Sequence, residues 1–499
     1  MAQLAEADSD NKSLGRRAAS QAISAGQMDL AIRLGRQMPL ESATTDVRLL
    51  LVADELRRGR PERALPYLAG QGEDGDLSFL APYVRAWAAA DRKNLADALT
   101  TLEQVPVNSL LGSYVSEQRA YILQKFKMSQ DAEPFAQRAI AGAARREIQV
   151  RLALADGFAG AGDKARALAM LNLPTAEAAN ARARIAAGQR LGFAVDTSAK
   201  ALSAMLLGLA LDLNRVNSTS LPIRLIQVAH YANPADSSAT IILGSLLQAQ
   251  DRSADAMAAF RSIRPDDLLA DQARDAEARS LTQAKRYDAA LALAHAAIAA
   301  PGAGSTDYSR LGDVYASMER HAAAAAAYQR ALELAGPQST DRWTLLLLRA
   351  SSLEAADRWP ESKAALEEAL KLAPDQPLIL NFLGYAKLER GEDLDDAEAM
   401  IRKASQMAPD DASITDSLGW AQYKRGKVSE AIETLQRAAV ADPAQAEIRE
   451  HLGDALYAAG RKFEARFAWE AAMVTADDDI SRRVKAKLES GLNKSNGAP

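Results

Sequence analysis

The chain has 499 residues, of which 48% are hydrophobic and 25% are charged, and its formal net charge is −5 at pH 7. This composition is typical of globular proteins, and the mild acidity disfavours a general nucleic-acid binder, which usually presents a basic surface. The absence of cysteine excludes disulfides, thiolate–zinc sites, a thiol nucleophile and an N-terminal lipidated cysteine, and no run of 18 uncharged apolar residues predicts a transmembrane helix.

The first residues, Met1 to Asp8, have no basic segment followed by an apolar run, so they do not resemble a signal peptide. As written, the sequence predicts a cytoplasmic protein. The alternative is a periplasmic protein whose leader was removed, because a cysteine-free chain suits an oxidising compartment equally well.

Residues 1–200 are expected to form a degenerate array of helical hairpins. Apolar residues recur there at helical spacing, as in Leu49, Val52, Ala53 and Leu56. Glycines mark turns between helices, but the distance from one unit to the next drifts. The units are predicted to end near Met38, Gly70, Val105, Ala141, Leu173 and Pro234.

The segment from Gly70 to Asp76 is predicted to be an acidic loop and no strand is expected anywhere in the chain. Gly70, Gly72 and Gly75 match the G-x-G-x-x-G pattern of dinucleotide-binding turns. That pattern needs a preceding strand, whereas a helix is expected before it, and the acidic side chains of the loop would repel a phosphate. We therefore expect no nucleotide site and no cofactor.

The repeat rhythm is weakest between Ala176 and Leu221, and Leu213 to Pro222 is predicted to be a polar link between helices. An enzyme with an unrecognised site in 176–221 is the less favoured alternative, since repeat scaffolds seldom carry an active site. The polar residues of this stretch form no familiar catalytic arrangement: Arg182, Arg184, Gln189, Arg190, Asp196 and Asn214.

Residues 201–478 are expected to form a regular repeat array with a step near 34 residues. In five of seven units a Leu-Gly pair lies about a dozen residues before a small residue, and in five a large apolar residue follows four positions after the small one. The small residues are Ala256, Ala290, Ala324, Ser362, Ala397, Ala431 and Ala465. The glycine and the small residue allow two helices to approach closely, and the apolar residue fills the interior. Three of the units close with a proline, which ends the second helix. The pattern predicts an all-α, right-handed superhelical solenoid of helix hairpins.

Residues 479–499 are expected to form a charged amphipathic capping helix, from about Ile480 to Leu488, followed by a disordered tail. A terminal repeat needs a polar cap because no further unit covers its face.

The last third of the chain resembles tetratricopeptide repeat proteins of proteobacteria, and more narrowly of alphaproteobacteria. The resemblance rests on Arg358–Ser362, Asn381–Tyr385, Asp416–Trp420, His451–Ala455 and Arg461–Trp469, and it is specific from about residue 340 to 475. It implies a non-enzymatic interaction scaffold. Some relatives are outer-membrane lipoproteins that recruit cell-envelope enzymes, whereas this sequence has neither leader nor lipidation cysteine.

The four histidines, His230, His295, His321 and His451, lack any metal-binding spacing, so no metal site is expected. His451 lies near two acids and could act as a base, but a packed or solvated histidine explains it better. Paired acids at predicted helix starts are explained by the helix dipole.

The first helices of stacked hairpins line the concave side of such a solenoid. Counting from the Leu-Gly pairs of the last three units predicts a groove of aromatic and carboxylate side chains, which suits a protein or peptide partner. The predicted groove residues are Asn381, Tyr385, Leu388, Asp416, Trp420, Tyr423, Glu450, Asp454 and Tyr457. The alternative is that these aromatics only pack between neighbouring helices.

The groove carboxylates favour a basic or amide-rich partner segment and disfavour an acidic C-terminal tail, which such repeats bind through lysines, arginines and asparagines. The predicted function is therefore a scaffold or adaptor that binds a protein in the C-terminal groove, with recruitment of an envelope enzyme as its narrower form. The alternative within the binding class is self-assembly through exposed helix faces; the oligomeric state is not fixed by the sequence.

Overall fold

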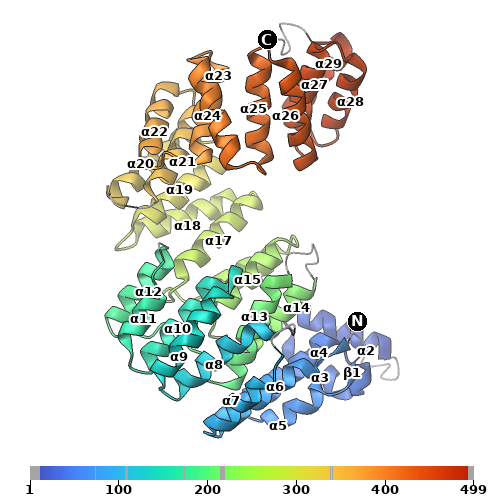
Figure 1. Cartoon of the computed structure of the whole chain (residues 1–499), viewed down its shortest axis with the longest axis vertical. Helices are drawn as coiled ribbons and strands as arrows, with labels where there is room; N and C mark the ends of the chain where they lie inside the picture. The colour runs from blue at the N-terminus through green and yellow to red at the C-terminus, as the bar shows by residue number, and fades with distance from the viewer. Residues whose placement is uncertain are drawn as a thin grey trace. The chain divides into compact units, whose positions relative to one another are not determined.

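The computed structural model describes residues 12–72, 75–106, 109, 111–173, 175–213, 220–337, 339 and 341–492. The chain divides into two compact units, residues 1–286 and 287–499. Helices dominate both units (Figure 1), which confirms the all-α repeat prediction. The sequence-based division at residue 200 rests on repeat regularity and stays a prediction, and the predicted tail falls mostly in residues 493–499, outside the described residues.

The first unit consists of short helices in hairpins and one small pair of strands. Its elements are α2 (Lys12–Ser24), α3 (Met28–Gln37), η1 (Leu40–Ser42), α4 (Thr45–Arg57), α5 (Pro61–Ala64), η2 (Leu65–Leu68), β1 (Gln71–Gly72), β2 (Gly75–Asp76), η3 (Ser78–Leu80), α6 (Ala81–Asp91), α7 (Leu95–Glu103), η4 (Gly112–Tyr114), α8 (Val115–Lys125), α9 (Ser129–Ala141), η5 (Ala144–Arg146), α10 (Glu147–Gly160), α11 (Lys164–Met170), α12 (Ala176–Ala186), α13 (Ser198–Leu213), α14 (Ser220–Ala232), α15 (Ser237–Gln248), α16 (Ser253–Arg261) and α17 (Ala270–Gln283).

The second unit is a regular series of hairpins in which each pair of consecutive helices packs together. Its elements are α18 (Tyr287–Ala299), α19 (Ser305–Ser317), α20 (His321–Ala335), α21 (Arg342–Ala355), α22 (Trp359–Leu372), α23 (Pro377–Glu389), α24 (Leu394–Met407), α25 (Ala412–Lys424), α26 (Val428–Ala441), α27 (Ala446–Ala458), α28 (Lys462–Ala472) and α29 (Asp478–Ser490). The hairpins are α19–α20, α21–α22, α23–α24, α25–α26 and α27–α28.

The glycine of each Leu-Gly pair lies where the two helices of a hairpin meet, as the repeat pattern predicts. A Cβ atom on Gly453 would lie 2.3 Å from Cδ1 of Trp469, and one on Gly312 would lie 2.5 Å from Cε1 of Tyr328. Trp469 and Tyr328 are the large residues four positions after the small residues Ala465 and Ala324. The close approach therefore exists because glycine leaves room for an aromatic ring from the second helix.

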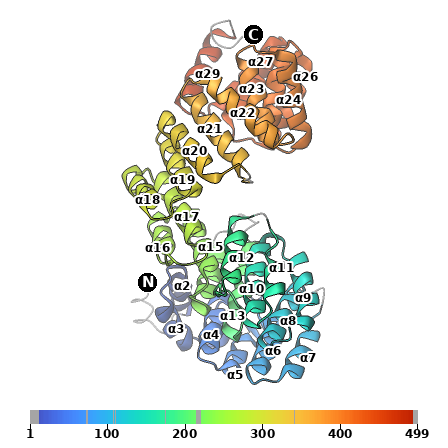
Figure 2. The same ribbon diagram turned by 90° about the vertical axis from the view of Figure 1, so that its left-hand side faces the viewer.

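In the first unit, α13 covers the face that the first helices of the preceding hairpins share. Both ribbon views show α13 at the centre of this unit, among α4, α6, α8 and α10 (Figures 1 and 2). It packs against α4, α6, η5 and α14, while α14 packs against α2 and α4. Ten of its 16 residues are buried, so α13 belongs to the core of the unit.

Polar contacts hold α14 and the segment before α13 in this position. Tyr231 Oη of α14 donates to Oδ1 of Asp54 at 2.8 Å, and Arg224 of α14 pairs with Asp46 at 3.1 Å. Lys125 Nζ donates to the carbonyl oxygen of Asp196 at 2.8 Å. In the stretch 176–221 that the sequence left open for an enzyme site, α13 therefore belongs to the core, and the enzyme alternative stays a prediction.

The segment from Gly70 to Asp76 corrects the expectation of a chain without strands. Gln71–Gly72 and Gly75–Asp76 pair as a two-residue antiparallel ribbon. The cause lies outside the segment, in the fully buried guanidinium of Arg48. Burial lowers the pKa of Arg48, although the charge of Asp76 opposes this effect. Arg48 donates to the carbonyl oxygens of Tyr67 at 2.8 Å, Ala69 at 3.1 Å, Gly70 at 3.2 Å and Gly75 at 3.1 Å.

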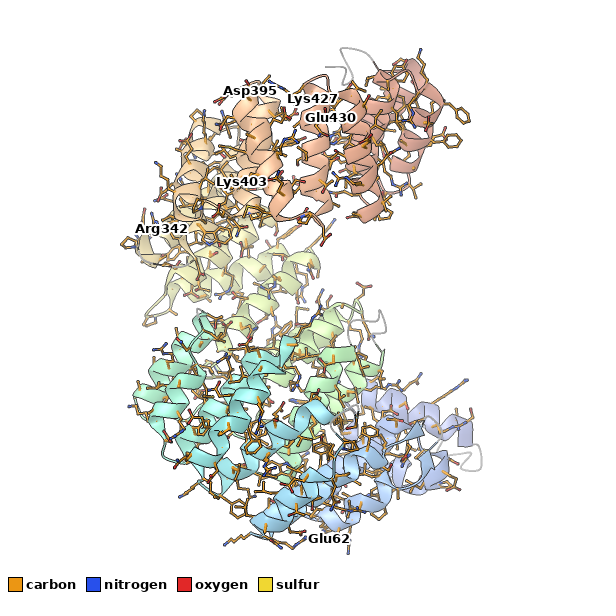
Figure 3. The ribbon with its side chains drawn as sticks, in the orientation of Figure 1. Glu62, Arg342, Asp395, Lys403, Lys427 and Glu430 are labelled. Carbon is orange, nitrogen blue, oxygen red and sulfur yellow. The ribbon has the colours of Figure 1, made fainter. Side chains whose placement is uncertain are left out.

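Ion pairs join successive hairpins along the outer edge of the second unit. Figure 3 shows Asp395, Lys427 and Glu430 at the same end of α24 and α26. Asp395 pairs with Arg425, and Lys427 Nζ lies 2.6 Å from Oε1 of Glu398. These contacts connect the hairpin α23–α24 to the hairpin α25–α26. Among the described helices, none is long and apolar enough to cross a membrane.

Candidate functional site: a groove across four helices

A groove of about 550 Å³ crosses α23, α25, α27 and α29 in the second unit. Four of the nine predicted residues line it, together with residues that the sequence did not single out. The lining residues are Tyr385, Glu389, Trp420, Lys424, Glu447, Glu450, His451, Asp454, Arg482, Arg483, Ala486 and Lys487.

A stack of rings forms the floor of this groove. The Trp420 ring lies against His451, with centroids 4.1 Å apart and planes at 16°, and against Tyr423 at 5.0 Å. Trp420 Nε1 donates to Oε1 of Glu389 at 2.7 Å, and Lys424 Nζ lies over the indole, 5.3 Å from its centroid. These contacts fix the indole in one orientation, with 7% of the residue exposed.

His451 connects α27 to α25 through an ion pair. Its Nδ1 lies 2.9 Å from Oδ2 and 3.1 Å from Oδ1 of Asp416, and both residues are buried. Burial alone would lower the pKa of His451, but the neighbouring charge and hydrogen bond of Asp416 outweigh it and raise the pKa. The imidazole is therefore held between the ring of Trp420 and a carboxylate whose charge favours the protonated form.

The two carboxylates of α27 are paired with cations of α29. Lys487 Nζ lies 2.7 Å from Oε1 of Glu450 and 2.6 Å from Oδ2 of Asp454, and Arg483 makes two hydrogen bonds to Glu450. Burial would raise the pKa of Glu450, but the hydrogen bond from Arg483 and the charge of Lys487 lower it. Burial raises the pKa of Asp454 to about 6, against the effect of Lys487. Neither carboxylate presents free charge to a ligand.

The predicted residues thus fall into two groups. Tyr385, Trp420, Glu450 and Asp454 line the groove. The other five do not line it: Leu388, Asp416 and Tyr423 are buried, and Asn381 and Tyr457 are half-buried. Tyr423 is fully buried, so it supports the groove from below and is not a contact surface. The alternative that the aromatics pack between helices therefore holds for Tyr423.

Sequence analysis missed the groove residues of α29, which it treated as a cap alone. Arg482 and Ala486 are exposed lining residues of this helix. The starts of α25 and α27 are 34 residues apart, whereas those of α27 and α29 are 32 apart. Adding 34 to the groove positions of α27 selects residues on the wrong side of α29. Adding 32, the actual distance between the starts of α27 and α29, selects Arg482 and Ala486.

The His451–Asp416 pair predicts a pH dependence of stability for the second unit. Because the folded pKa of His451 is raised above its unfolded value near 6.5, the stabilisation is complete below about pH 6.5 and is lost as the pH rises through the folded pKa. A difference of one pH unit between the folded and unfolded pKa values corresponds to about 1.4 kcal/mol. Urea unfolding at several pH values should show this decline in wild type and not in His451→Gln. An equal decline in both proteins would contradict the assignment.

A second, larger cavity of about 920 Å³ lies in the first unit. Arg184 and Arg190 line it, but Arg184 donates to the carbonyl oxygens of Asp266 and Asp267, and Arg190 pairs with Asp156 at 2.8 Å. Both arginines are therefore already paired within the first unit: Arg184 with the segment between α16 and α17, and Arg190 with α10. Among the residues that the structure describes, no group of three or more histidine, aspartate or glutamate side chains could hold a metal ion.

The tetratricopeptide repeat model matches residues 308–337, 347–412 and 417–479, which correspond to α19 through α28. Among solved structures, the chain is similar to the Cut9–Hcn1 hetero-tetramer of the APC/C (15% identity, 97% of this chain and 96% of that chain, TM-score 0.42) and to yeast Tom70 (14%, 83% and 95%, 0.44). It is also similar to TTC0263 of Thermus thermophilus (21%, 37% and 100%, 0.33), described as a thermophilic TPR protein. No curated protein sequence matches it.

Proposed function

We propose that this protein is a non-enzymatic scaffold that binds a segment of a partner protein in the groove across α23, α25, α27 and α29. Tetratricopeptide repeats in α19 to α28 support a protein-interaction scaffold in general. The observation that carries the narrower proposal is the fixed indole of Trp420, which lies on the floor of an open groove beside the half-buried Tyr385. Rigid aromatic side chains in a groove supply contact area at little cost in conformational entropy.

The exposed rim of the groove has both signs of charge. Glu389 and Glu447 lie on it with Lys424, Arg482 and Arg483. The expectation of a basic partner came from carboxylates that are already paired inside the chain, so it loses that support. The partner segment that fits best places an apolar or aromatic side chain against the half-buried Tyr385 and the small exposed part of Trp420, and has charges of both signs beside it. A clamp for a terminal carboxylate would need free cations, whereas Arg483 is engaged with Glu450.

Affinity capture from the source cells tests this proposal, with soluble and envelope fractions kept apart. The groove variant is Glu447→Lys with Arg482→Glu, two exposed lining residues whose replacement leaves the core intact. The matched control is Glu433→Lys with Arg437→Glu, the same exchange of charges at exposed positions of α26. We expect a partner to bind wild type and control and to be reduced at least about tenfold with the groove variant. Equal capture by all three would contradict the groove.

The affinity capture also distinguishes recruitment of an envelope enzyme from self-assembly. A proteobacterial origin and the recruitment of an envelope enzyme rest on the sequence resemblance, and recovery of an enzyme from the envelope fraction would support the second. Self-assembly is the alternative function. It predicts that the captured protein is the chain itself and that its mass by light scattering exceeds 53.4 kDa and grows with concentration.

A further inference from the structure

The terminal helix α29 is attached to the second unit by charge more than by apolar contact. Only Val484 and Lys487 are buried among its 13 residues. By comparison, α27, which has the same length, buries eight residues. The apolar contribution of α29 is limited to Val484 and to the partly buried Ile480 and Leu488.

Three close contacts between opposite charges fix α29 on α27. Lys487, whose side chain is 4% exposed, lies between Glu450 and Asp454, and Arg483, which is 50% exposed, reaches Glu450 from the solvent side. The two cations lie four residues apart and thus on the same face of α29. An apolar and basic stripe therefore faces an acidic surface of α27.

The cations that pair with Glu450 and Asp454 both belong to α29, so its departure removes these cations together with the cover that α29 places over the two carboxylates. Removing one partner of a buried ion pair is costly when the other charge stays buried, and that cost is smaller when the cover leaves with the partner. Asp454 keeps the hydrogen bond from Nε1 of Trp469. Salt weakens the half-exposed contact of Arg483 with Glu450 more than the buried contacts of Lys487.

We propose that α29 is a displaceable helix, and that a basic amphipathic helix of a partner protein competes with it for the surface formed by Glu450, Asp454 and the adjoining part of α28. The partner must have two cations four residues apart, as Arg483 and Lys487 are, and an apolar residue at the position of Val484. Docking of such a helix uses the helix-in-groove mode of recognition. This surface lies beneath α29 and shares Glu450 and Asp454 with the groove lining. The inference concerns the state in which α29 has left, and its test measures peptide binding to that surface and not binding in the groove.

A fluorescent peptide of residues 477–491 tests the proposal against the full-length chain. The helix that is already present competes at a high effective concentration, so wild type should bind the peptide weakly. Arg483→Ala with Lys487→Ala weakens that helix and should make peptide binding at least about tenfold tighter by fluorescence anisotropy. Lys485→Ala alters an exposed cation of the same helix that does not line the groove, and this variant should bind as wild type does.

Two further measurements make the result decisive. A peptide in which glutamine replaces the residues equivalent to Arg483 and Lys487 should not bind any chain. In wild type, amide hydrogen exchange across 478–490 should accelerate with added salt while α27 stays protected. Equal binding or no binding of the native peptide by all chains, or salt-independent protection of α29, would overturn the proposal. If two chains exchanged their α29 helices and formed a dimer, the displacing helix would come from a second copy of this chain, and the proposal of a different partner protein would be wrong.

Discussion

Replacement of Trp469 by alanine is expected to lower the free energy of unfolding of the second unit by about 3–5 kcal/mol. Trp469 has no exposed surface, and its ring fills the space that Gly453 leaves on α27. Its Nε1 also donates to Oδ1 of the fully buried Asp454 at 2.9 Å. The substitution therefore creates a cavity and removes a hydrogen bond from a buried carboxylate.

Urea unfolding measured by circular dichroism checks this value. Phe463→Ala on the same helix is the matched control, because Phe463 is 74% exposed and its loss should change stability by less than about 0.5 kcal/mol. A similar loss in both variants would show that α28 does not pack as described.

Glu117→Ala is expected to destabilise the first unit by about 3–5 kcal/mol. Oε2 of Glu117 accepts from Nη1 of Arg146 at 2.7 Å, and the two side chains are 2% and 4% exposed. Burial raises the pKa of Glu117, although Arg146 opposes this effect. The guanidinium also lies over the ring of Tyr114, 4.1 Å from its centroid. Without Glu117, a buried cation loses its counter-charge.

The double variant Glu117→Ala with Arg146→Met separates this explanation from loss of packing. It should be more stable than Glu117→Ala alone, because no charge then stays buried. Glu103→Ala is the control, since Glu103 is 57% exposed in its pair with Arg119 at 3.1 Å, and this pair should contribute less than about 1 kcal/mol. If the double variant were the less stable protein, the buried pair would not be the cause.

The hairpins of the second unit could be predicted because each depends on residues close in sequence. Gly453, Ala465 and Trp469 lie within 17 positions, and their sizes are mutually dependent: the glycine leaves the space that the tryptophan occupies. The same dependence links Gly312 to Tyr328. A fixed spacing between small and large residues thus determines both the helix pair and its packing.

The position of α13 in the first unit could not be predicted in this way. Its partners come from elements that lie far away in sequence, as in the hydrogen bond from Tyr114 to Asp212. The same holds for the neighbouring α14, whose Tyr231 donates to Asp54. Most of the side chains of α13 are buried, so its sequence has no periodic pattern from which the helices it packs against could be predicted. Its cover over α4 and α6 also explains why the preceding hairpins lack a regular repeat pattern, since their shared face packs on α13 and not on an open groove.

The sequence indicated which helix faces line the candidate groove, but it did not indicate that the carboxylates there are paired with cations. Counting from the Leu-Gly pairs selected Tyr385 and Trp420, which line the groove, because these residues lie on the first helices of regular hairpins. The charge of Glu450 and Asp454 was misjudged, because the cations that pair with them come from α29, beyond the last recognised repeat. A sequence count gives the face of a helix and does not give the side chains that cover it.

Site-specific photo-crosslinking tests the central claim, that the groove across α23, α25, α27 and α29 binds the partner. A benzophenone amino acid would replace Ala486, an exposed lining residue, and, in a second protein, Glu433 on α26. If the partner binds in the groove, illumination in cells yields an adduct of defined mass from position 486 and none from position 433. Adducts from position 433 alone, or the same adducts from both, would contradict it.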